Sequence, residues 1–379
     1  MTQPWTFVDS PPTEDVGGGW VTLVEGSSFC ISDVDGTISP GGFQGLYVQD
    51  LRLLSGWRLT VDGAAPRGMT VVHRAPFAAE YVASSPPPPS AADDPRPSLV
   101  VIRRRYVGLG MREDLVVVND SARAVTCRLA LAADTDFADV FEVKAGRPGN
   151  PLHSERDVIG HTLRLTAGPS GRPISVLLQP DEAADVAPDG LSWHVEVPAR
   201  GQWSTSVHVE AEVAGTVLHL RYPRGFPPRH GAPARRFRAW RARSPLARTG
   251  DPELGKVLRR SVEDIGTLRI CDPSHPQRQV VAAGAPWFMA PFGRDALLTS
   301  WMILPVDTSL ALGTLQMLAD HQGTVSNPRS DEEPGRIVHE LRFGPTAREA
   351  LENGHAYYGS ADATPLFVML LGQLTRWRT

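Results

Sequence analysis

Between residues 20 and 220, apolar and polar residues alternate in short segments that Gly, Pro, Asp and Asn interrupt. A period of two places successive side chains on opposite faces of a strand, which is typical of a half-buried antiparallel sheet. The segments are WVTLV, SFCISDV, GWRLTVDG, LVVIRRRYVGLGMREDLVVVND, AVTCRLALAAD, HTLRLTA, ISVLLQP, LSWHVEVP and WSTSVHVEAEV. This succession of strands predicts a large antiparallel β-sandwich over residues 1–220.

Two proline-rich stretches interrupt the pattern. Residues 84–97 contain four successive prolines, which donate no hydrogen bonds to a ladder, so we expect a loop there. Residues 221–250 are dense in Pro and Arg, and their arginines around Phe237 and Trp240 resemble a nucleic-acid-binding patch in composition. We instead interpret this stretch as a solvated linker between domains, because the chain as a whole is acidic.

After Asp251 the period changes to that of amphipathic helices. One apolar stripe runs from Leu254 to Leu268 behind an Asp–Pro start, a second helix is expected from Asp307 to Gly323, and a third opens at Asp362. Asp307 is interpreted as a helix cap. The sequence therefore predicts a β domain over residues 1–220, a linker over 221–250 and a helical domain over 251–379.

Composition excludes several classes of function. The chain has 379 residues and a net charge of −4, so it offers no overall basic field to nucleic acid. The three cysteines follow no metal-like spacing, and neither a signal peptide nor a membrane-spanning run is apparent. We therefore expect a cytoplasmic protein with no metal, no cofactor, no nucleic-acid partner and no membrane association.

The run APWFMAPFGRDALLTSW, residues 285–301, combines charge with aromatic rings. Arg294 and Asp295 stand at the expected start of a helix, among Trp287 and Phe292. Two charges among aromatic rings are costly unless they are paired and used. We expect Arg294 and Asp295 to pair at the mouth of a pocket that Trp287 or Phe292 lines.

Two further loops carry carboxylates and aromatic residues before a helix. In SDEEPGRIVHELRFG, residues 330–344, Pro334 is suited to a first helical turn, which would place Glu333 at the N-cap. HAYYGSADATPLF, residues 355–367, places Asp362 beside two tyrosines. Carboxylates, arginine and flat aromatic faces are the groups that bind sugar hydroxyls and the apolar face of a sugar ring.

Structural alternatives remain open for these loops. Capping alone would account for Glu333 and Asp362. A surface pair four residues apart would account for Arg336 and Glu340. His339 is equally interpreted as a core histidine with its hydrogen bonds satisfied.

The segments WFMAPFGRDALLTSW, ALGTLQMLADHQGT, DEEPGRIVHELRFG and YYGSADATPLF occur in an order that resembles the start of the catalytic domain of bacterial glycogen-debranching enzymes of the amylo-α-1,6-glucosidase type, a group of (α/α)6-barrel glycosidases. Upstream, GLYVQDLRLLSGWRLTVDG and DTDFADVFEVKAG resemble the N-terminal β-sandwich domain of the same family. The resemblance runs from about residue 25 to the end. Ala296, where a small hydroxyl residue is expected, is a mild departure.

The resemblance implies a role for each candidate residue. It places Arg294 and Asp295 at the sugar of the cleavage subsite, with Trp287 and Phe292 shaping that subsite. It places Glu333, His339, Glu340 and Asp362 along the wall of the substrate funnel. The implied reaction is hydrolysis of an α-1,6-glucosidic branch of a glycogen-like glucan, with Asp295 orienting substrate.

Length qualifies this expectation. Only 129 residues follow Gly250, whereas twelve helices of about 11 residues with connections of about 5 need roughly 190. We expect an incomplete (α/α)6 barrel, with the general acid beyond Thr379 and only Glu333 and Glu340 as candidates within the chain. The chain alone is then expected to be inactive, to expose the apolar faces of ALLTSWMIL and TPLFVMLLGQL, and to need a separately encoded remainder of the barrel. The alternative is a non-catalytic glucan-binding or assembly module.

Overall fold

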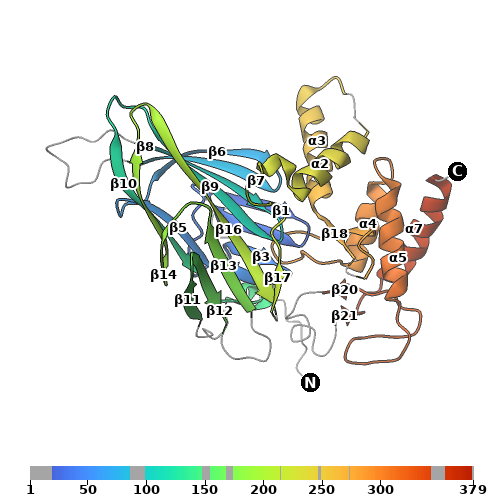
Figure 1. Cartoon of the computed structure of the whole chain (residues 1–379). Coiled ribbons are helices and arrows are strands. Elements are labelled where there is room, and N and C mark those ends of the chain that lie inside the picture. Colours follow the sequence, from blue (N-terminus) through green and yellow to red (C-terminus); the bar gives the residue numbers. More distant parts are fainter. Residues whose placement is uncertain are drawn as a thin grey trace.

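The computed structural model describes residues 19–85, 99–146, 154–167, 174–213, 215–245, 249–272, 274–342 and 355–377. An antiparallel β-rich part precedes a helical part, and Figure 1 shows the two side by side. The predicted loop of four prolines lies outside the described residues. In the described part, no helix combines the length and apolar character needed to cross a membrane.

The predicted strands are confirmed. The strands of the β-rich part are β1 (Trp20–Glu25), β2 (Ser28–Asp33), β3 (Gly45–Val48), β4 (Leu51–Leu54), β5 (Gly56–Val61), β6 (Arg67–Ala75), β7 (Ala78–Ser85), β8 (Leu99–Val107), β9 (Gly110–Asn119), β10 (Val125–Asp134), β11 (Glu155–Ile159), β12 (Thr162–Thr166), β13 (Ile174–Pro180), β14 (Asp185–Ala187), β15 (Gly190–Val197), β16 (Gly201–Val213) and β17 (Thr216–Leu218). A short helix, α1 (Val140–Lys144), follows β10, with Asp139 and Glu142 forming a capping box at its start.

The larger sheets enclose the main core. One has the order β14-β15-β10-β5, and the other has the order β11-β12-β13-β16-β9-β8-β7-β6, with β17 paired to β16. Buried side chains from both sheets meet in one cluster, which includes Trp57, Leu129, Trp193, Val117 and Val209. The alternating burial of β8, β10 and β16 gives each strand one face toward this core, as the period of two predicts.

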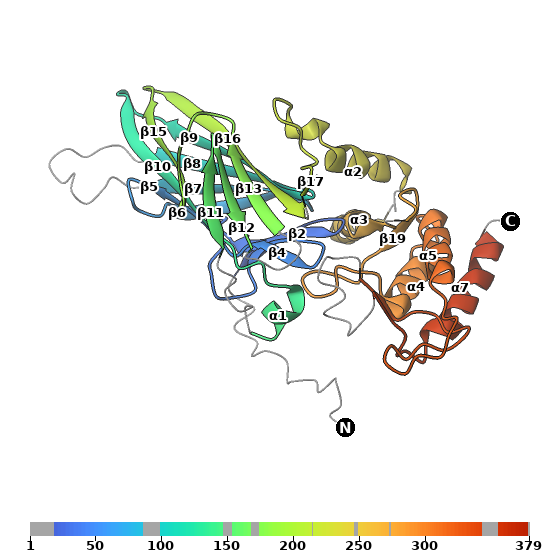
Figure 2. The same ribbon diagram turned by 60° about the horizontal axis from the view of Figure 1, so that its bottom comes forward.

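A smaller sheet, β1-β2-β3-β4, joins the β-rich part to the helical part. Alternate residues of β2 serve different cores: Cys30 packs in the sandwich, whereas Phe29 and Ile31 pack with helical-part residues. Phe29 stacks on Tyr47 of β3 at a centroid distance of 4.5 Å. Because both faces of these strands are buried, the small sheet is a layer between the two parts, as Figure 2 shows for β2 and β4.

The helical part begins with α2 (Ala232–Arg243) and α3 (Pro252–Thr267), which pack together. Trp240 of α2 is fully buried, and its indole N–H donates to the Val262 carbonyl of α3 at 2.8 Å. A Cβ at Gly266 would lie 2.5 Å from the Trp240 ring, so this close packing requires glycine. The stretch interpreted as a solvated linker therefore contains a helix with a buried face, although the domain boundaries themselves stay a prediction.

Further along the described chain, α4 (Gly293–Met302), α5 (Thr308–Asp320) and α7 (Ala363–Trp377) pack against one another. Two pairs of short strands lie between helices: β18 (Arg269–Cys271) pairs with β19 (Gln279–Val281) between α3 and α4, and β20 (Glu340–Leu341) pairs with β21 (Ala356–Tyr357) between α5 and α7. The predicted caps are confirmed for α3 and α5, where Asp251 and Asp307 accept hydrogen bonds from backbone N–H groups of the first turn. The expected barrel type stays a prediction.

The predicted exposure of apolar side chains on α4 and α7 is confirmed. Met302 of α4 is 75% exposed, and Val368 of α7 is 64% exposed. Val257 of α3 is also exposed, so its predicted stripe is buried only toward its C-terminal end, where Val262 and Ile265 contact the core around Trp240. Only part of the apolar surface of these helices is covered within the described residues.

Candidate functional site

The start of α4 is held by the segment that carries β20. The Gly293 N–H donates to the His339 carbonyl at 2.7 Å, and Phe292 forms a β-bridge with Glu340. A Cβ at residue 293 would lie 2.2 Å from the Val338 carbonyl oxygen, so only glycine permits this approach. The His339 N–H donates to the Tyr357 carbonyl at 2.7 Å, which ties the loop before α7 to the same place. Three loops far apart in the sequence therefore converge.

Aromatic rings form a row across this convergence. Each neighbouring pair of rings packs edge to face. The ring centroids lie 5.4 Å apart for Phe288 and Phe292, 5.7 Å for Phe292 and His339, and 6.0 Å for His339 and Tyr357. The ammonium group of Lys144 lies 5.1 Å from the centre of the Phe288 ring. The buried Nδ1 of His339 has no hydrogen-bond partner among the described residues, which contradicts the interpretation of His339 as a satisfied core histidine.

A charged pair borders the aromatic row. Arg294 Nη1 lies 3.1 Å from Asp362 Oδ2, with about half of the Arg294 side chain exposed. The Ser360 hydroxyl also donates to Asp362. The Ser360 hydrogen bond, followed by the Arg294 charge, lowers the pKa of Asp362 despite partial burial, so this carboxylate is ionised at neutral pH. The Asp362 side chain therefore bonds to Ser360 and Arg294, and no helix-capping hydrogen bond of this side chain is described.

The predicted pairing of Arg294 with Asp295 is wrong. Neighbouring residues of a helix point in directions about 100° apart, so Arg294 reaches the start of α7 instead of Asp295. Asp295 is half-buried in the first turn of α4, where the helix dipole favours a carboxylate. No hydrogen bond or ion pair of its side chain is among those described. Arg294 and Asp295 line none of the cavities described for this structure, so their expected place at a pocket mouth stays a prediction.

The predicted helix start at Pro334 is also wrong. Residues 331–336 form a turn, in which Gly335 has φ +86° and Asp331 has φ +53°. Positive φ values are incompatible with a right-handed helix, so Glu333 has no helix to cap. Its side chain is 71% exposed and its carboxylate lies 3.9 Å from Arg336. The suggested surface pair of Arg336 with Glu340 does not form.

Asp331 in this turn contacts the aromatic row. Its carboxylate accepts a hydrogen bond from the Tyr357 hydroxyl at 3.0 Å, and its carbonyl accepts one from Arg336 at 2.8 Å. Burial, followed by this hydrogen bond to Asp331, raises the pKa of Tyr357, so its hydroxyl stays protonated. The turn therefore supplies Asp331 to the convergence, and it leaves Glu333 at the periphery.

Glu340 and Trp287 belong to a structural joint between the two parts. Glu340 accepts a hydrogen bond from Arg342 Nε at 2.6 Å, and Arg342 Nη1 donates to Asp50 at 2.6 Å. Arg342 Nη2 also donates to the Trp287 carbonyl at 3.0 Å. The Trp287 ring packs edge to face on Phe43 of the β-rich part, with 6.4 Å between the ring centroids. Arg342 is 1% exposed and Glu340 is 5% exposed, so the carboxylate of Glu340 is buried in this joint. The predicted roles of Trp287 and Glu340 at a bound sugar stay predictions.

Reasoning from the sequence missed Arg342 and Asp50. The sequence does carry one signal for Arg342: in ELR the two charges are two positions apart around a leucine, which predicts a strand with both charges on one face. Burial raises the pKa of Asp50, although the Arg342 charge opposes this effect. No local pattern identifies Asp50 as the partner of Arg342.

One group of described residues has the spacing of metal ligands. Ligand atoms of Asp272, His275 and Asp320 lie within 4.8 Å of one another. Arg278 forms an ion pair with Asp320, and its Nη1 lies 3.7 Å from Asp272. Because the Arg278 guanidinium already supplies the positive charge at this cluster, we assign no metal to it.

The β-rich part is similar to a domain of a known family. Residues 23–208 match the model of the N-terminal domain of some glycogen debranching enzymes. No curated protein matches the chain. The matched region includes the main sandwich strands and the small sheet that contacts the helical part.

Comparison with solved structures supports the fold. A putative kojibiose phosphorylase from the human microbiome aligns with a TM-score of 0.51 at 9% identity, over 80% of this chain and 46% of that chain. This chain therefore spans about half the length of that structure. A galactose mutarotase-like protein from Clostridium acetobutylicum aligns with a TM-score of 0.29 at 8% identity, over 50% of this chain and 94% of that chain, which is too low for an argument. At 9% identity this likeness shows the fold alone, so membership of the glycoside-hydrolase group and the amylo-α-1,6-glucosidase type both stay predictions.

Proposed function

We propose that this chain is the glucan-binding part of a glycoside hydrolase of the glycogen-debranching kind, which acts on α-1,6 branches. The observation that carries the proposal is the convergence of the Arg294–Asp362 pair with the row of Phe292, His339 and Tyr357 at the start of α4. The match of residues 23–208 to the N-terminal domain of glycogen debranching enzymes supports the same substrate class.

Each group at the convergence has a function suited to a neutral sugar. The ionised Asp362 carboxylate accepts hydrogen bonds from hydroxyl groups, and Arg294 donates to neighbouring hydroxyl oxygens. Phe288, with 43% of its surface exposed, offers an apolar ring to the C–H face of a sugar. In this proposal Asp295 orients the substrate from the first turn of α4.

Hydrolysis with inversion requires a carboxylic acid to protonate the leaving oxygen and a carboxylate roughly 6.5 to 9.5 Å away to activate water. Asp362 is unsuited to be the acid, because its pKa is lowered by Ser360 and Arg294. Glu340 is unsuited because it is buried against Arg342. We therefore propose a substrate-positioning role for the described convergence and assign no general acid within it.

Glucan binding tests this proposal. The affinity of the purified chain for a branched limit dextrin and for maltoheptaose would be measured by calorimetry. Changing Arg294 to Gln or Asp362 to Asn removes a charge-assisted hydrogen bond, which is worth about 1.5–3 kcal/mol, so we expect roughly 10- to 100-fold weaker binding. The matched control is Arg67→Gln, which removes the same charge from an exposed position on β6.

Two results would contradict the proposal. One is the absence of saturable binding to either glucan. The other is an equal affinity of the Arg294→Gln, Arg67→Gln and unsubstituted chains. Release of glucose from limit dextrin by this chain, lost on changing Glu333 to Gln, would instead assign the acid to Glu333.

A further inference from the structure

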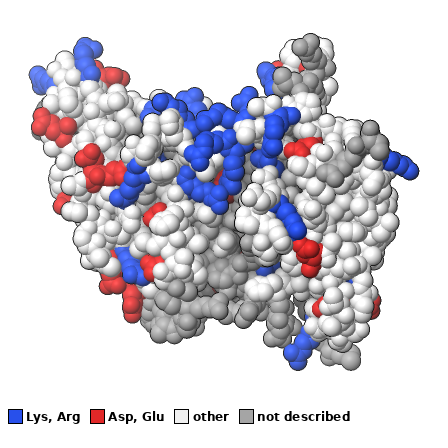
Figure 3. Space-filling model, turned by 45° about the vertical axis from the view of Figure 1, so that its right-hand side comes forward, with Lys and Arg blue, Asp and Glu red and all other residues white. Residues whose placement is uncertain are grey.

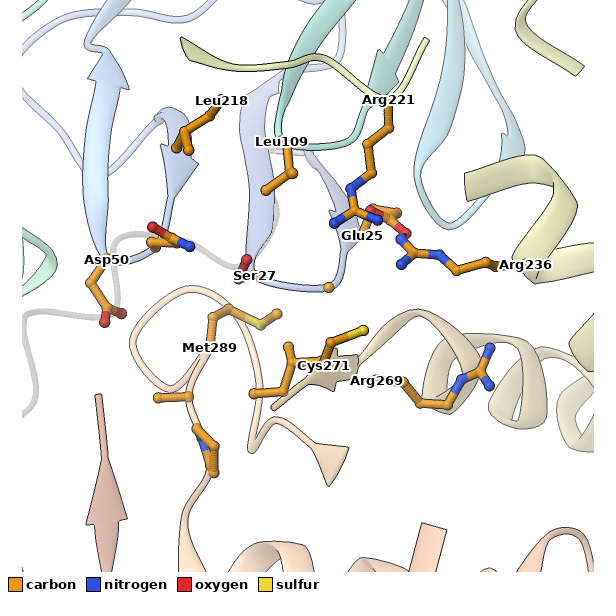
Figure 4. A pocket seen from close by; sticks show the side chains of 15 residues that line it. Glu25, Ser27, Asp50, Leu109, Leu218, Arg221, Arg236, Arg269, Cys271 and Met289 are labelled. Atoms are coloured by element: carbon orange, nitrogen blue, oxygen red, sulfur yellow. The ribbon is translucent and has the colours of Figure 1, made fainter. Parts of the chain in front are cut away.

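A cavity of about 200 Å³ lies where the small sheet meets the helical part. Its wall comes from the turn after β1, the chain after β17, α2, β18 and the loop before α4, and Figure 4 shows several of these side chains pointing into one space. Arg294 and Asp362 do not line it. The cavity is therefore distinct from the proposed glucan site and needs its own explanation.

Arginine is the most abundant charged residue of the wall. Arg221, Arg236 and Arg269 come from three separate segments. In Figure 4 the Arg221 and Arg236 side chains extend toward Glu25 from two different backbone segments. Figure 3 shows Lys and Arg side chains gathered around a hollow on one face of the molecule.

Both carboxylates of the cavity wall already form ion pairs. Glu25 forms an ion pair with Arg236, and Asp50 forms one with Arg342 outside the wall. Arg269 donates to the Gly266 carbonyl and to the Gln279 side chain, and its guanidinium lies 4.3 Å from the centre of the Trp240 ring. Among the described ion pairs, none pairs Arg221 or Arg269 with a carboxylate. Figure 4 shows the Arg269 side chain directed away from the shared space, so the unpaired positive charge at the cavity is that of Arg221.

Burial makes positive charge costly at the other two arginines of the wall. It lowers the pKa of Arg236 and lowers that of Arg269 to about 10, where the charges of Arg243 and Arg236 add to the effect. Neutral polar groups complete the wall: Ser27 and Gln49 line the cavity, and no side-chain hydrogen bond of either is described. A bound anion would compensate the excess charge and use these donors.

We propose that this cavity binds a phosphate group, either as free phosphate or as part of a sugar phosphate. The planar guanidinium forks of Arg221 and Arg236 match the oxygen spacing of phosphate, and Arg236 pairs with Glu25 through only part of its donor set. The volume exceeds that of free phosphate and accommodates a small attached group. Because the wall joins the small sheet to α2 and β18, binding stabilises the contact between the two parts.

Calorimetry with inorganic phosphate, glucose 1-phosphate and unphosphorylated glucose, at constant ionic strength, tests the inference. We expect saturable binding of phosphate or the sugar phosphate, or of both, and none of glucose. Arg221→Gln removes one fork from a side chain without a described bond, so the affinity is expected to fall at least tenfold. Arg221→Lys keeps the charge without the fork and is expected to give an intermediate affinity.

Arg259→Gln is the matched control, because Arg259 is exposed on α3 and outside the cavity. Equal losses of phosphate affinity in Arg221→Gln and Arg259→Gln would overturn the inference. It would also be overturned if glucose bound as tightly as the phosphate compounds, or if neither phosphate compound showed saturable binding. Tighter binding of glucose 1-phosphate than of phosphate would assign the site to a sugar phosphate, and equal binding would assign it to free phosphate. Glucan binding at the other site is not altered by either variant, so the two proposals fail separately.

Discussion

Inside the sandwich, the most deeply buried charges form a compensated group, whereas the helices leave large apolar side chains exposed. Glu113 of β9 is fully buried and accepts hydrogen bonds from Arg103 at 2.8 Å and from Arg105 at 2.7 Å. The Trp57 indole N–H donates to the same carboxylate at 3.2 Å. The Glu113 carboxylate in the sandwich core is therefore compensated by residues of the β-rich part itself.

The helical part depends on its neighbour. Much of its core is completed by Phe29, Ile31 and Tyr47 of the small sheet, and Arg342 is held by Asp50. Its outer apolar side chains, such as Met302 and Val368, remain in solvent. We infer that the β-rich part is stabilised mainly by contacts among its own residues, whereas the helices are stabilised mainly by their contacts with the small sheet and Asp50. The following predictions test this difference, from the largest expected effect to the smallest.

Removing the central charge of the sandwich should have the largest effect. Glu113→Gln leaves two buried arginines without their carboxylate, so the free energy of unfolding is expected to fall by about 3–5 kcal/mol. Urea unfolding monitored by tryptophan fluorescence measures this loss. Glu196→Gln, at an exposed position of β15, is the control. Equal losses in the two variants would show that the buried group is not a source of stability.

Removing Arg342 should affect the joint rather than the sandwich. Arg342→Met leaves Asp50 and Glu340 buried without a cation, and we expect a loss of about 3 kcal/mol. Hydrogen exchange is expected to accelerate in α4 and α7 more than in β8 and β9. Uniform acceleration across both parts would contradict the separation of stability proposed above. Arg259→Gln, which removes an exposed charge from α3, is expected to leave exchange unchanged.

Lowering the pH should reduce the stabilisation from a buried carboxylate more than that from an exposed one. Burial alone would raise the pKa of Glu113, but Arg103 and Arg105 hold it below the ordinary value of 4.5. The stabilisation from Glu113 is therefore fully present above pH 4.5 and is lost as the pH falls through its lower folded-state pKa. We expect Glu113→Gln to flatten the decline of the melting temperature in this acidic range.

Asp362 provides the exposed comparison for that measurement. Its pKa is also lowered, so its contribution is lost in the same direction as the pH falls. Because the ion pair with Arg294 is about half exposed, solvent screens it, and Asp362→Asn is expected to change the acid slope little. If Asp362→Asn flattened the acid decline of the melting temperature more than Glu113→Gln does, the expected order of the buried and the exposed carboxylate would be wrong.

The smallest effect on stability is expected on the outer helical face. Met302→Gln and Val368→Gln change side chains that are already in solvent, so the free energy of unfolding should change by less than about 0.5 kcal/mol. Self-association at high concentration, measured by sedimentation velocity, should decrease because an apolar patch is removed. A loss above about 2 kcal/mol would mean that these side chains are buried in solution.

Local periodicity was sufficient to predict the strands and most helices. The alternation in β8, β10 and β16 reflects one face on the core, and the acidic caps Asp251 and Asp307 mark helix starts. It failed for α2, because an Arg- and Pro-rich composition concealed the buried face around Trp240. It also failed at Pro334, where the positive φ of Gly335 turns the chain.

The candidate site was predictable as a set of segments and not as a set of contacts. The motifs around Arg294, His339 and Asp362 do converge, because backbone hydrogen bonds join their loops. The pairing partners depend on tertiary structure: Arg294 bonds to Asp362 instead of Asp295, and Glu340 serves Arg342. No periodicity within one segment encodes such choices.

The pair formed by Asp50 and Arg342 also has a consequence for biosynthesis. The two residues are 292 positions apart, so the ribosome, adding roughly 5–20 residues per second, delivers Arg342 about 15 to 60 s after Asp50. During that interval the sandwich strands have been synthesised, but the Asp50 carboxylate has no guanidinium to bind. The nascent β-rich part must therefore keep this acidic position hydrated until Arg342 has been synthesised, so this ion pair cannot contribute to the early folding of the sandwich.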